Sequence, residues 1–182
     1  MIALRLSLLA ALLAATPSLA GPPDYEPAAA SVRRLMEELV TADTTNPPGN
    51  EARAVAIVER RLKEAGIAFE SSEFAPGREN LVARLGGSGE EEPLLLLAHT
   101  DVVGTAGQNW SSDPLRVTEK EGFLLGRGVS DDLGMAAVAT EVMILLERSG
   151  TPLRRDVILA LTGDEESGGA GIRHLLAERP AG

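Results

Sequence analysis

Three short polar clusters carry the side chains of this sequence that could do chemistry. They are His99-Thr100-Asp101, Ser130-Asp131-Asp132 and Asp164-Glu165-Glu166. Imidazole and carboxylate groups bind divalent metal ions, and carboxylates also serve as general acids and bases. Because the sequence contains no cysteine, any metal site that it builds must use these two ligand types.

The first cluster places an imidazole and a carboxylate two residues apart, at His99 and Asp101. In an extended chain these two side chains point to the same side. One ring nitrogen could then meet the carboxylate while the other binds a metal ion. An isolated pair of this kind more often caps the end of a strand, so the pair alone leaves both interpretations open.

The other two clusters are rich in carboxylates. Either Asp131 or Asp132 could be the N-cap or first-turn acid of a helix that is predicted to follow. The acidic run at 164–166 follows a predicted buried strand and could equally be a solvated loop. If these carboxylates converge in one crevice with His99, a divalent metal ion is needed to neutralise them.

The hydrophobic pattern predicts the elements that position the clusters. Helices are expected at 28–40, 50–66, 132–148 and 170–178, strands at 67–74, 81–85, 94–98 and 156–162, and a hairpin at 117–125. The continuous apolar run Leu94–Ala98 favours a central strand covered on both faces. This order predicts an α/β fold with a central mixed, largely parallel sheet and helices on both faces. Ligand sites in such sheets gather at the carboxyl ends of strands, where the first and third clusters fall.

The N-terminal residues predict that the protein is exported from the cytoplasm. Arg5 precedes an apolar run from Leu6 to Ala15, and 18–20 offers small residues for signal peptidase, so 1–20 reads as a signal peptide. We expect 21–27 to be a flexible leader, 28–182 to belong to one domain, and the protein to be periplasmic or secreted. No later apolar run is long enough to span a membrane, so no membrane association is expected after signal cleavage.

The charge of the chain argues against polyanionic partners. There are 27 Asp and Glu residues against 17 Lys and Arg, a net charge of −10. Nucleic acids and anionic membrane surfaces bind to basic faces, so neither is an expected partner. The net charge does not indicate what kind of substrate the protein acts on.

Taken in order, five segments resemble the co-catalytic zinc family of metallopeptidases, family 20. This family includes aminoacylases, acetylornithine deacetylases, succinyl-diaminopimelate desuccinylases, glutamate carboxypeptidases and dipeptidases. The segments are 45–51 (TNPPGNE), 98–103 (AHTDVV), Trp110 with 113–114, 126–128 with Asp131, and 162–169 (TGDEESGG). The resemblance implies a zinc-exopeptidase-like catalytic domain that hydrolyses an amide bond of a small peptide or N-acyl amino acid.

The resemblance also implies a role for each site residue. His99 and Glu166 resemble ligands of two different zinc ions, and Asp131 resembles the carboxylate that bridges both. Asp101 resembles the acid that orients His99. Glu165 resembles the general base, which takes a proton from metal-activated water and passes it to the leaving nitrogen. The same ligands would also suit cobalt or manganese.

Parts of the family pattern are not found in these residues. Leu133 stands where the family often has lysine, and the resemblance implies a further acidic ligand, a final histidine and a lid and dimerisation domain that this sequence does not show. We therefore expect only the N-terminal part of a catalytic domain, with any oligomer formed through the missing domain of the full-length parent. His174 is expected to be an ordinary helix residue.

Two alternatives stay open at this point. One is a truncated, catalytically inactive fragment that binds at most one metal ion weakly. The other is a non-catalytic exported binding module, in which the three polar clusters are separate surface loops. The substrate, the metal and the oligomeric state are not fixed by the sequence.

Overall fold

The computed structural model describes residues 25–178. The signal peptide predicted at 1–20 lies outside the described residues, as does most of the leader predicted at 21–27. The first helix, α1 (Glu26–Thr41), begins two residues earlier than expected. Pro27 lies in its first turn, where the missing N–H group of proline breaks no hydrogen bond of the helix.

A four-stranded sheet forms the centre of the fold, in the order β2-β3-β8-β4. Its strands are β2 (Phe69–Ala75), β3 (Arg78–Leu85), β8 (Val157–Thr162) and β4 (Leu94–His99). β3 pairs antiparallel with β2 and with β8, whereas β4 and β8 are parallel. The mixed sheet of the predicted α/β fold is therefore confirmed. The expectation of a largely parallel sheet is wrong for the described residues, because two of the three strand pairs in this sheet are antiparallel.

Two small pairs of strands lie outside the main sheet. β1 (Thr45–Asn46) pairs parallel with β5 (Val102–Val103), and β6 (Thr118–Lys120) pairs antiparallel with β7 (Phe123–Leu125). The second pair is the hairpin expected at 117–125, and Glu121 and Gly122 form its tip with positive φ. The first pair brings the segment around Asn46 next to the chain that follows β4.

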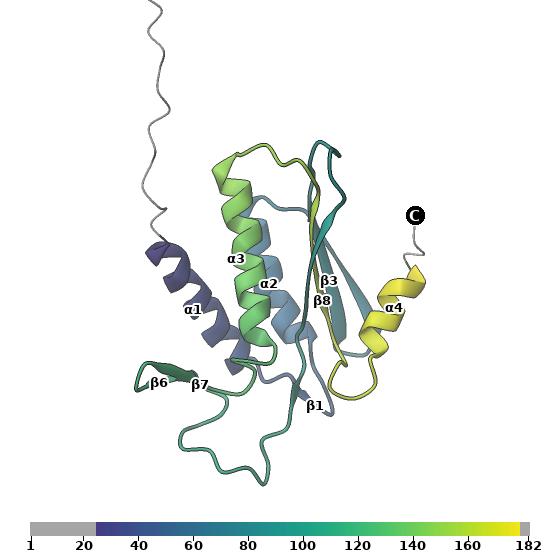
Figure 1. The fold of residues 1–182 in the computed structure, drawn as a ribbon. Coiled ribbons are helices and arrows are strands. Elements are labelled where there is room, and N and C mark those ends of the chain that lie inside the picture. The colour runs from purple at the N-terminus through teal and green to yellow at the C-terminus, as the bar shows by residue number, and fades with distance from the viewer. Residues whose placement is uncertain (1–24, 179–182) are drawn as a thin grey trace, which may run out of the picture.

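Helices cover both faces of the sheet, as predicted (Figure 1). α1, α2 (Ala52–Ala65) and α3 (Leu133–Ser149) lie on one face, and α4 (Ala170–Glu178) lies on the other. The core lies between the three helices and the sheet. Its fully buried side chains include Leu35, Leu39, Val55, Val58, Leu62, Leu81, Leu159 and Leu161.

The prediction for β4 was wrong in one respect, because this strand is not covered on both faces. Among the described residues it forms an edge of the sheet, and Leu95 and Leu97 are each 53% exposed. α3 packs over one face of β4, whereas α4 packs over β2 and β3. A continuous apolar run shows that a strand can be buried, but not which elements cover it.

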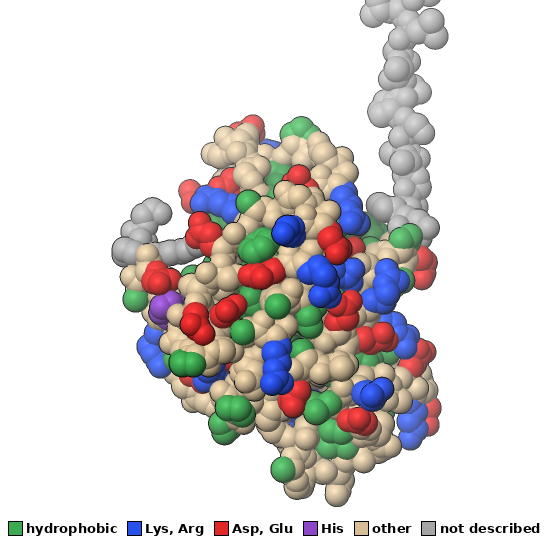
Figure 2. Space-filling model, turned by 180° about the vertical axis from the view of Figure 1, so that it is seen from behind, with side chains coloured by type: hydrophobic (Ala, Val, Ile, Leu, Met, Phe, Trp, Pro, Cys, Tyr) green, Lys and Arg blue, Asp and Glu red, His purple; other side chains and the backbone are tan. Residues whose placement is uncertain are grey.

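Charged side chains of both signs are intermixed on the face opposite that of Figure 1, as Figure 2 shows. Ion pairs on the protein surface include Arg84 with Asp156 and Arg154 with Glu90. Within residues 25–178, no helix combines the length and the apolar character needed to cross a bilayer.

Candidate metal centre

The three polar clusters converge at the carboxyl ends of β4 and β8. One ligand atom from each of His99, Asp131 and Glu166 lies within 4.8 Å of the others. The strand pairing explains how two of the clusters meet: β4 and β8 are parallel, and His99 is opposite Thr162, just before the acidic run. The alternative of three separate surface loops does not fit this geometry.

The two ring nitrogens of His99 have different surroundings. Nδ1 lies 2.9 Å from the backbone oxygen of Asp101, and Nε2 lies 2.9 Å from Oδ1 of Asp131. A carbonyl oxygen can only accept, so Nδ1 is the nitrogen that carries a hydrogen in the neutral ring. Nε2 then directs its lone pair towards Asp131, which is the orientation that a metal ligand requires.

The electrostatics of His99 favour a cation at this position. Burial, the largest single influence, lowers the pKa of the ring, but the neighbouring carboxylates of Asp101 and Asp131 outweigh it and raise the pKa to about 9. In the metal-free protein a proton therefore occupies Nε2 at neutral pH. A metal ion would take the place of that proton.

Asp101 contacts more than His99. Its backbone oxygen binds the ring, while its carboxylate lies 3.6 Å from Nδ1. The same carboxylate accepts hydrogen bonds from the backbone N–H of Glu165 at 3.0 Å and of Glu166 at 3.1 Å, and from the side-chain amide of Asn46 at 2.8 Å. The carboxylate thus holds the acidic loop in place, a role that the sequence pattern does not predict.

These hydrogen bonds also set the charge state of Asp101. The residue is fully buried, and burial, the largest influence, raises its pKa. His99, the Asn46 amide and the two backbone N–H groups of the acidic loop act in the opposite direction and hold the pKa at about 2. Asp101 is therefore a carboxylate at any pH near neutrality.

The remaining acids of the cluster differ in exposure. The side chains of Asp131 and Glu165 are 75% and 61% exposed, and Glu165 lies 3.9 Å from Nε2 of His99. Glu166 is half-buried, and burial followed by the nearby carboxylates raises its pKa despite the attraction of His99. Crowded carboxylates around one imidazole are the donor set of a divalent cation such as zinc. The residues present therefore fit a metal ion.

Asp132 plays a different part from Asp131. It occupies the N-cap position of α3 without making a side-chain cap hydrogen bond. Its carboxylate instead accepts a hydrogen bond from the backbone N–H of His99 at 3.2 Å. The peptide bond that joins the two aspartates is cis. The sequence left open which of the two aspartates forms the N-cap of the helix, and Asp132 occupies that position.

A cavity of about 290 Å³ opens beside the metal centre. The residues that line it include His99 and Glu165 as well as the apolar side chains of Leu97 and Ile172. A ligand in this cavity would contact both polar and apolar side chains.

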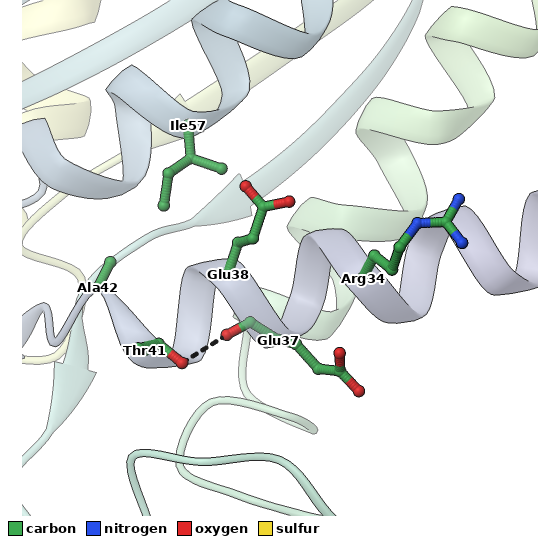
Figure 3. Close-up of a pocket in the computed structure, with 6 residues that line it drawn as sticks. All are labelled: Arg34, Glu37, Glu38, Thr41, Ala42 and Ile57. Atoms are coloured by element: carbon green, nitrogen blue, oxygen red, sulfur yellow. Dashed lines mark hydrogen bonds between the residues drawn. The ribbon is translucent and has the colours of Figure 1, made fainter.

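A second hollow and a second histidine lie outside the three polar clusters. The hollow between α1 and α2 in Figure 3 is lined by Arg34, Glu37, Glu38, Thr41, Ala42 and Ile57. It contains no histidine, and its Thr41 hydroxyl donates to the backbone oxygen of Glu37 at 2.8 Å. His174 lies on α4 and pairs with Glu178 at 3.2 Å, so it contacts its own helix rather than the polar clusters.

Comparison with known proteins gives matches in sequence. The family described as "Peptidase family M20/M25/M40" matches residues 95–182. A succinyl-diaminopimelate desuccinylase from Gluconacetobacter diazotrophicus is 33% identical over 143 residues, covering 77% of this chain and 36% of the relative. An acetylornithine deacetylase from Myxococcus xanthus is 35% identical over 151 residues, covering 80% of this chain and 38% of the relative. The chain thus spans well under half the length of these curated relatives.

The fold also has solved counterparts. The crystal structure of human carnosine dipeptidase 1 superposes with a TM-score of 0.71 at 20% identity, covering 85% of this chain and 37% of that one. At this identity the likeness concerns the fold alone.

Proposed function

Since this chain belongs to peptidase family M20/M25/M40, we propose that it carries the metal centre of an amide-bond hydrolase acting on small peptides or N-acyl amino acids. The observation that carries the proposal is the convergence of His99, Asp131 and Glu166 within 4.8 Å. The relatives support it, because a desuccinylase and a deacetylase are named for removing acyl groups and the structural neighbour is named a dipeptidase.

We assign the ligands as follows. His99 would bind one metal ion and Glu166 a second, and the exposed carboxylate of Asp131 could be shared by both. Imidazole nitrogen and carboxylate oxygen suit zinc, and cobalt or manganese would also be accepted. When bound, such ions lower the pKa of a water molecule and polarise the carbonyl oxygen of a substrate.

Glu165 is the proposed general base. Its carboxylate lies 3.9 Å from Nε2 of His99, beside the ligand atoms, and it lines the cavity. From there it can accept a proton from water and deliver it to the leaving nitrogen. Asp101 supports this step by holding the backbone of Glu165 and Glu166 through its carboxylate.

The cavity and the N-terminus suggest the substrate class. The apolar side chains of Leu97 and Ile172, which line the same cavity as Glu165, favour substrates with a small apolar group beside the scissile amide.

We propose that the protein is exported, because residues 1–20 have the pattern of a signal peptide. An exported enzyme of this kind would scavenge peptides rather than act in cytosolic biosynthesis.

Metal binding and hydrolysis by the purified chain test the proposal. After metal removal, we expect Zn²⁺ or Co²⁺ to bind at a fixed stoichiometry, with hydrolysis of dipeptides or N-acyl amino acids. Glu165→Gln should keep the metal and lose roughly 10²–10⁴-fold in rate. Glu166→Gln should lose metal affinity, and Glu147→Gln, a change of the same type at an exposed position on α3, should alter neither property.

The other outcomes contradict the proposal for this chain. Protein that binds no metal and is inert would remove the hydrolase assignment. Protein that binds metal without hydrolysis would support the inactive fragment instead. Hydrolysis that survives Glu165→Gln would exclude Glu165 as the base.

A further inference from the structure

We infer that Arg78 is a positioning residue of the metal centre: its guanidinium joins Glu51 to Asp164 and thereby fixes the loop that carries Glu165 and Glu166. The inference rests on the proposed function, because it assigns a residue that serves the same site. Arg78 lies at the start of β3 and does not itself belong to the ligand cluster.

The contacts of Arg78 run in two directions. Nε donates to Oε2 of Glu51 at 2.9 Å and a terminal nitrogen donates to Oε1 at 2.5 Å, which makes a bidentate pair. The other terminal nitrogen donates to Oδ1 of Asp164 at 2.9 Å. Glu51 is fully buried, and the Arg78 side chain is only 16% exposed. A planar guanidinium can bind two carboxylates in this way, whereas the single nitrogen of lysine cannot reproduce it.

Asp164 is the start of the acidic loop and is held on several sides. Its backbone N–H donates to Oε1 of Glu51 at 3.1 Å, the same carboxylate that Arg78 binds. Its Oδ2 accepts the backbone N–H of Ala170 at 2.9 Å, which closes the turn before α4. Asp164 has a φ of 64°, an uncommon value for a residue other than glycine. These contacts stabilise that conformation and therefore the direction in which the loop leaves β8.

Asn46 connects Asp164 to the metal centre. Its Nδ2 donates to Oδ1 of Asp164 at 3.1 Å and to Oδ2 of Asp101 at 2.8 Å. Asp101 in turn accepts the backbone N–H groups of Glu165 and Glu166. A displacement of Asp164 would therefore move both the proposed base and a proposed ligand.

The backbone packs closely against the Arg78–Glu51 pair at two glycines. A Cβ atom on Gly49 would lie 2.3 Å from Nε of Arg78, and one on Gly163 would lie 2.8 Å from Cδ of Glu51. Both glycines thus allow the backbone to approach the pair directly. The guanidinium is held by hydrogen bonds to two carboxylates in this close-packed setting, as a positioning residue requires.

Metal affinity of Arg78→Lys tests the inference. The change keeps the positive charge but removes the forked geometry. We expect the full chain to fold and its Zn²⁺ affinity, measured by competition with a chelating dye, to weaken about 10- to 100-fold, the usual effect of losing a group that supports a metal ligand. The visible spectrum of the Co²⁺ form should also change, because the ligands are displaced. Arg84→Lys on the same strand, whose surface pair with Asp156 is remote from this network, should stay within twofold of wild type.

A second variant keeps the test decisive. If Arg78→Lys does not fold, Asp164→Asn carries the test, since it removes the charge that Arg78 binds while keeping size, and it should weaken Zn²⁺ binding in the same direction. A merely structural Arg78 would lower the unfolding midpoint and leave the Zn²⁺ affinity and Co²⁺ spectrum of the folded protein unchanged. That result would overturn the inference.

The inference and the proposed function fail in different ways. If wild type binds Zn²⁺, Glu166→Gln abolishes binding and Arg78→Lys equals wild type, only the inference is wrong. If wild type binds no Zn²⁺, both are overturned.

Discussion

Nε2 of His99 lies 2.9 Å from Oδ1 of Asp131. Nε2 can bind either a proton or a metal ion, but not both at once. Because the proton and the metal ion compete for Nε2 of this buried imidazole, metal binding depends on pH. The same geometry makes the metal-free protein itself sensitive to pH.

The first prediction concerns metal affinity. Because the pKa of His99 is about 9 in the metal-free protein, the ion must displace a proton at neutral pH. We expect the apparent affinity for Zn²⁺ to rise about tenfold per pH unit up to about pH 9 and then to level off. Titrations in a non-coordinating buffer measure this dependence. His174→Asn should leave the slope unchanged, and an affinity that does not vary between pH 6 and 9 would contradict the role of His99.

The second prediction concerns stability without metal. The pKa of His99 is raised from 6.5 to about 9 on folding, so its contribution to the free energy of unfolding is full below about pH 6.5 and is lost as pH rises through 9. We expect urea unfolding in the presence of a chelator to show falling stability across this range. His99→Gln should reduce the pH dependence there. A wild-type curve with the same slope as the variant would be the opposing result.

The third prediction concerns Asp101. Asp101→Asn replaces a carboxylate that accepts three N–H hydrogen bonds by an amide with one acceptor oxygen. We expect the free energy of unfolding at pH 7 to fall by about 1–3 kcal/mol, together with weaker Zn²⁺ binding. Because the pKa of Asp101 is lowered from 3.8 to about 2, its contribution is present above pH 3.8 and is lost as pH falls through 2.

Urea unfolding at pH 7 and pH 2 provides the measurement. The difference between wild type and Asp101→Asn should be smaller at the lower pH. Asp113→Asn is the matched control, since the side chain of Asp113 is exposed and should change stability little. Equal effects of the two variants would show that the Asp101 carboxylate does not hold the acidic loop.

Local pattern was enough to predict where the polar clusters of β4 and β8 meet. Apolar runs of strand length end at His99 and shortly before Glu165, and parallel strands bring their carboxyl ends together. The supporting network was not predictable in the same way. Arg78 meets Glu51 across 27 positions and Asn46 meets Asp164 across 118, and no periodicity links residues that far apart. Asn46 and Glu51 did fall within one of the family-like segments, which was the one available signal.

The exposed leucines of β4 give the last prediction, which tests whether this strand forms an exposed edge of the sheet. Leu95 and Leu159 lie on adjacent parallel strands, but Leu95 is 53% exposed at the sheet edge while Leu159 is fully buried. Leu159→Ala removes buried methyl groups and leaves a cavity, so it should lower the free energy of unfolding by about 2–5 kcal/mol. Leu95→Ala removes atoms that are largely in water already and should lower it by less than about 1 kcal/mol.

The two leucine variants serve as controls for each other, because the chemical change is identical and only the burial of the side chain differs. Urea unfolding of both at one protein concentration gives the comparison. Similar losses would mean that Leu95 is covered in solution and that β4 is an interior strand after all. A small loss for Leu95 beside a large one for Leu159 would place the sheet edge at β4, with its apolar side chains exposed beside the metal centre.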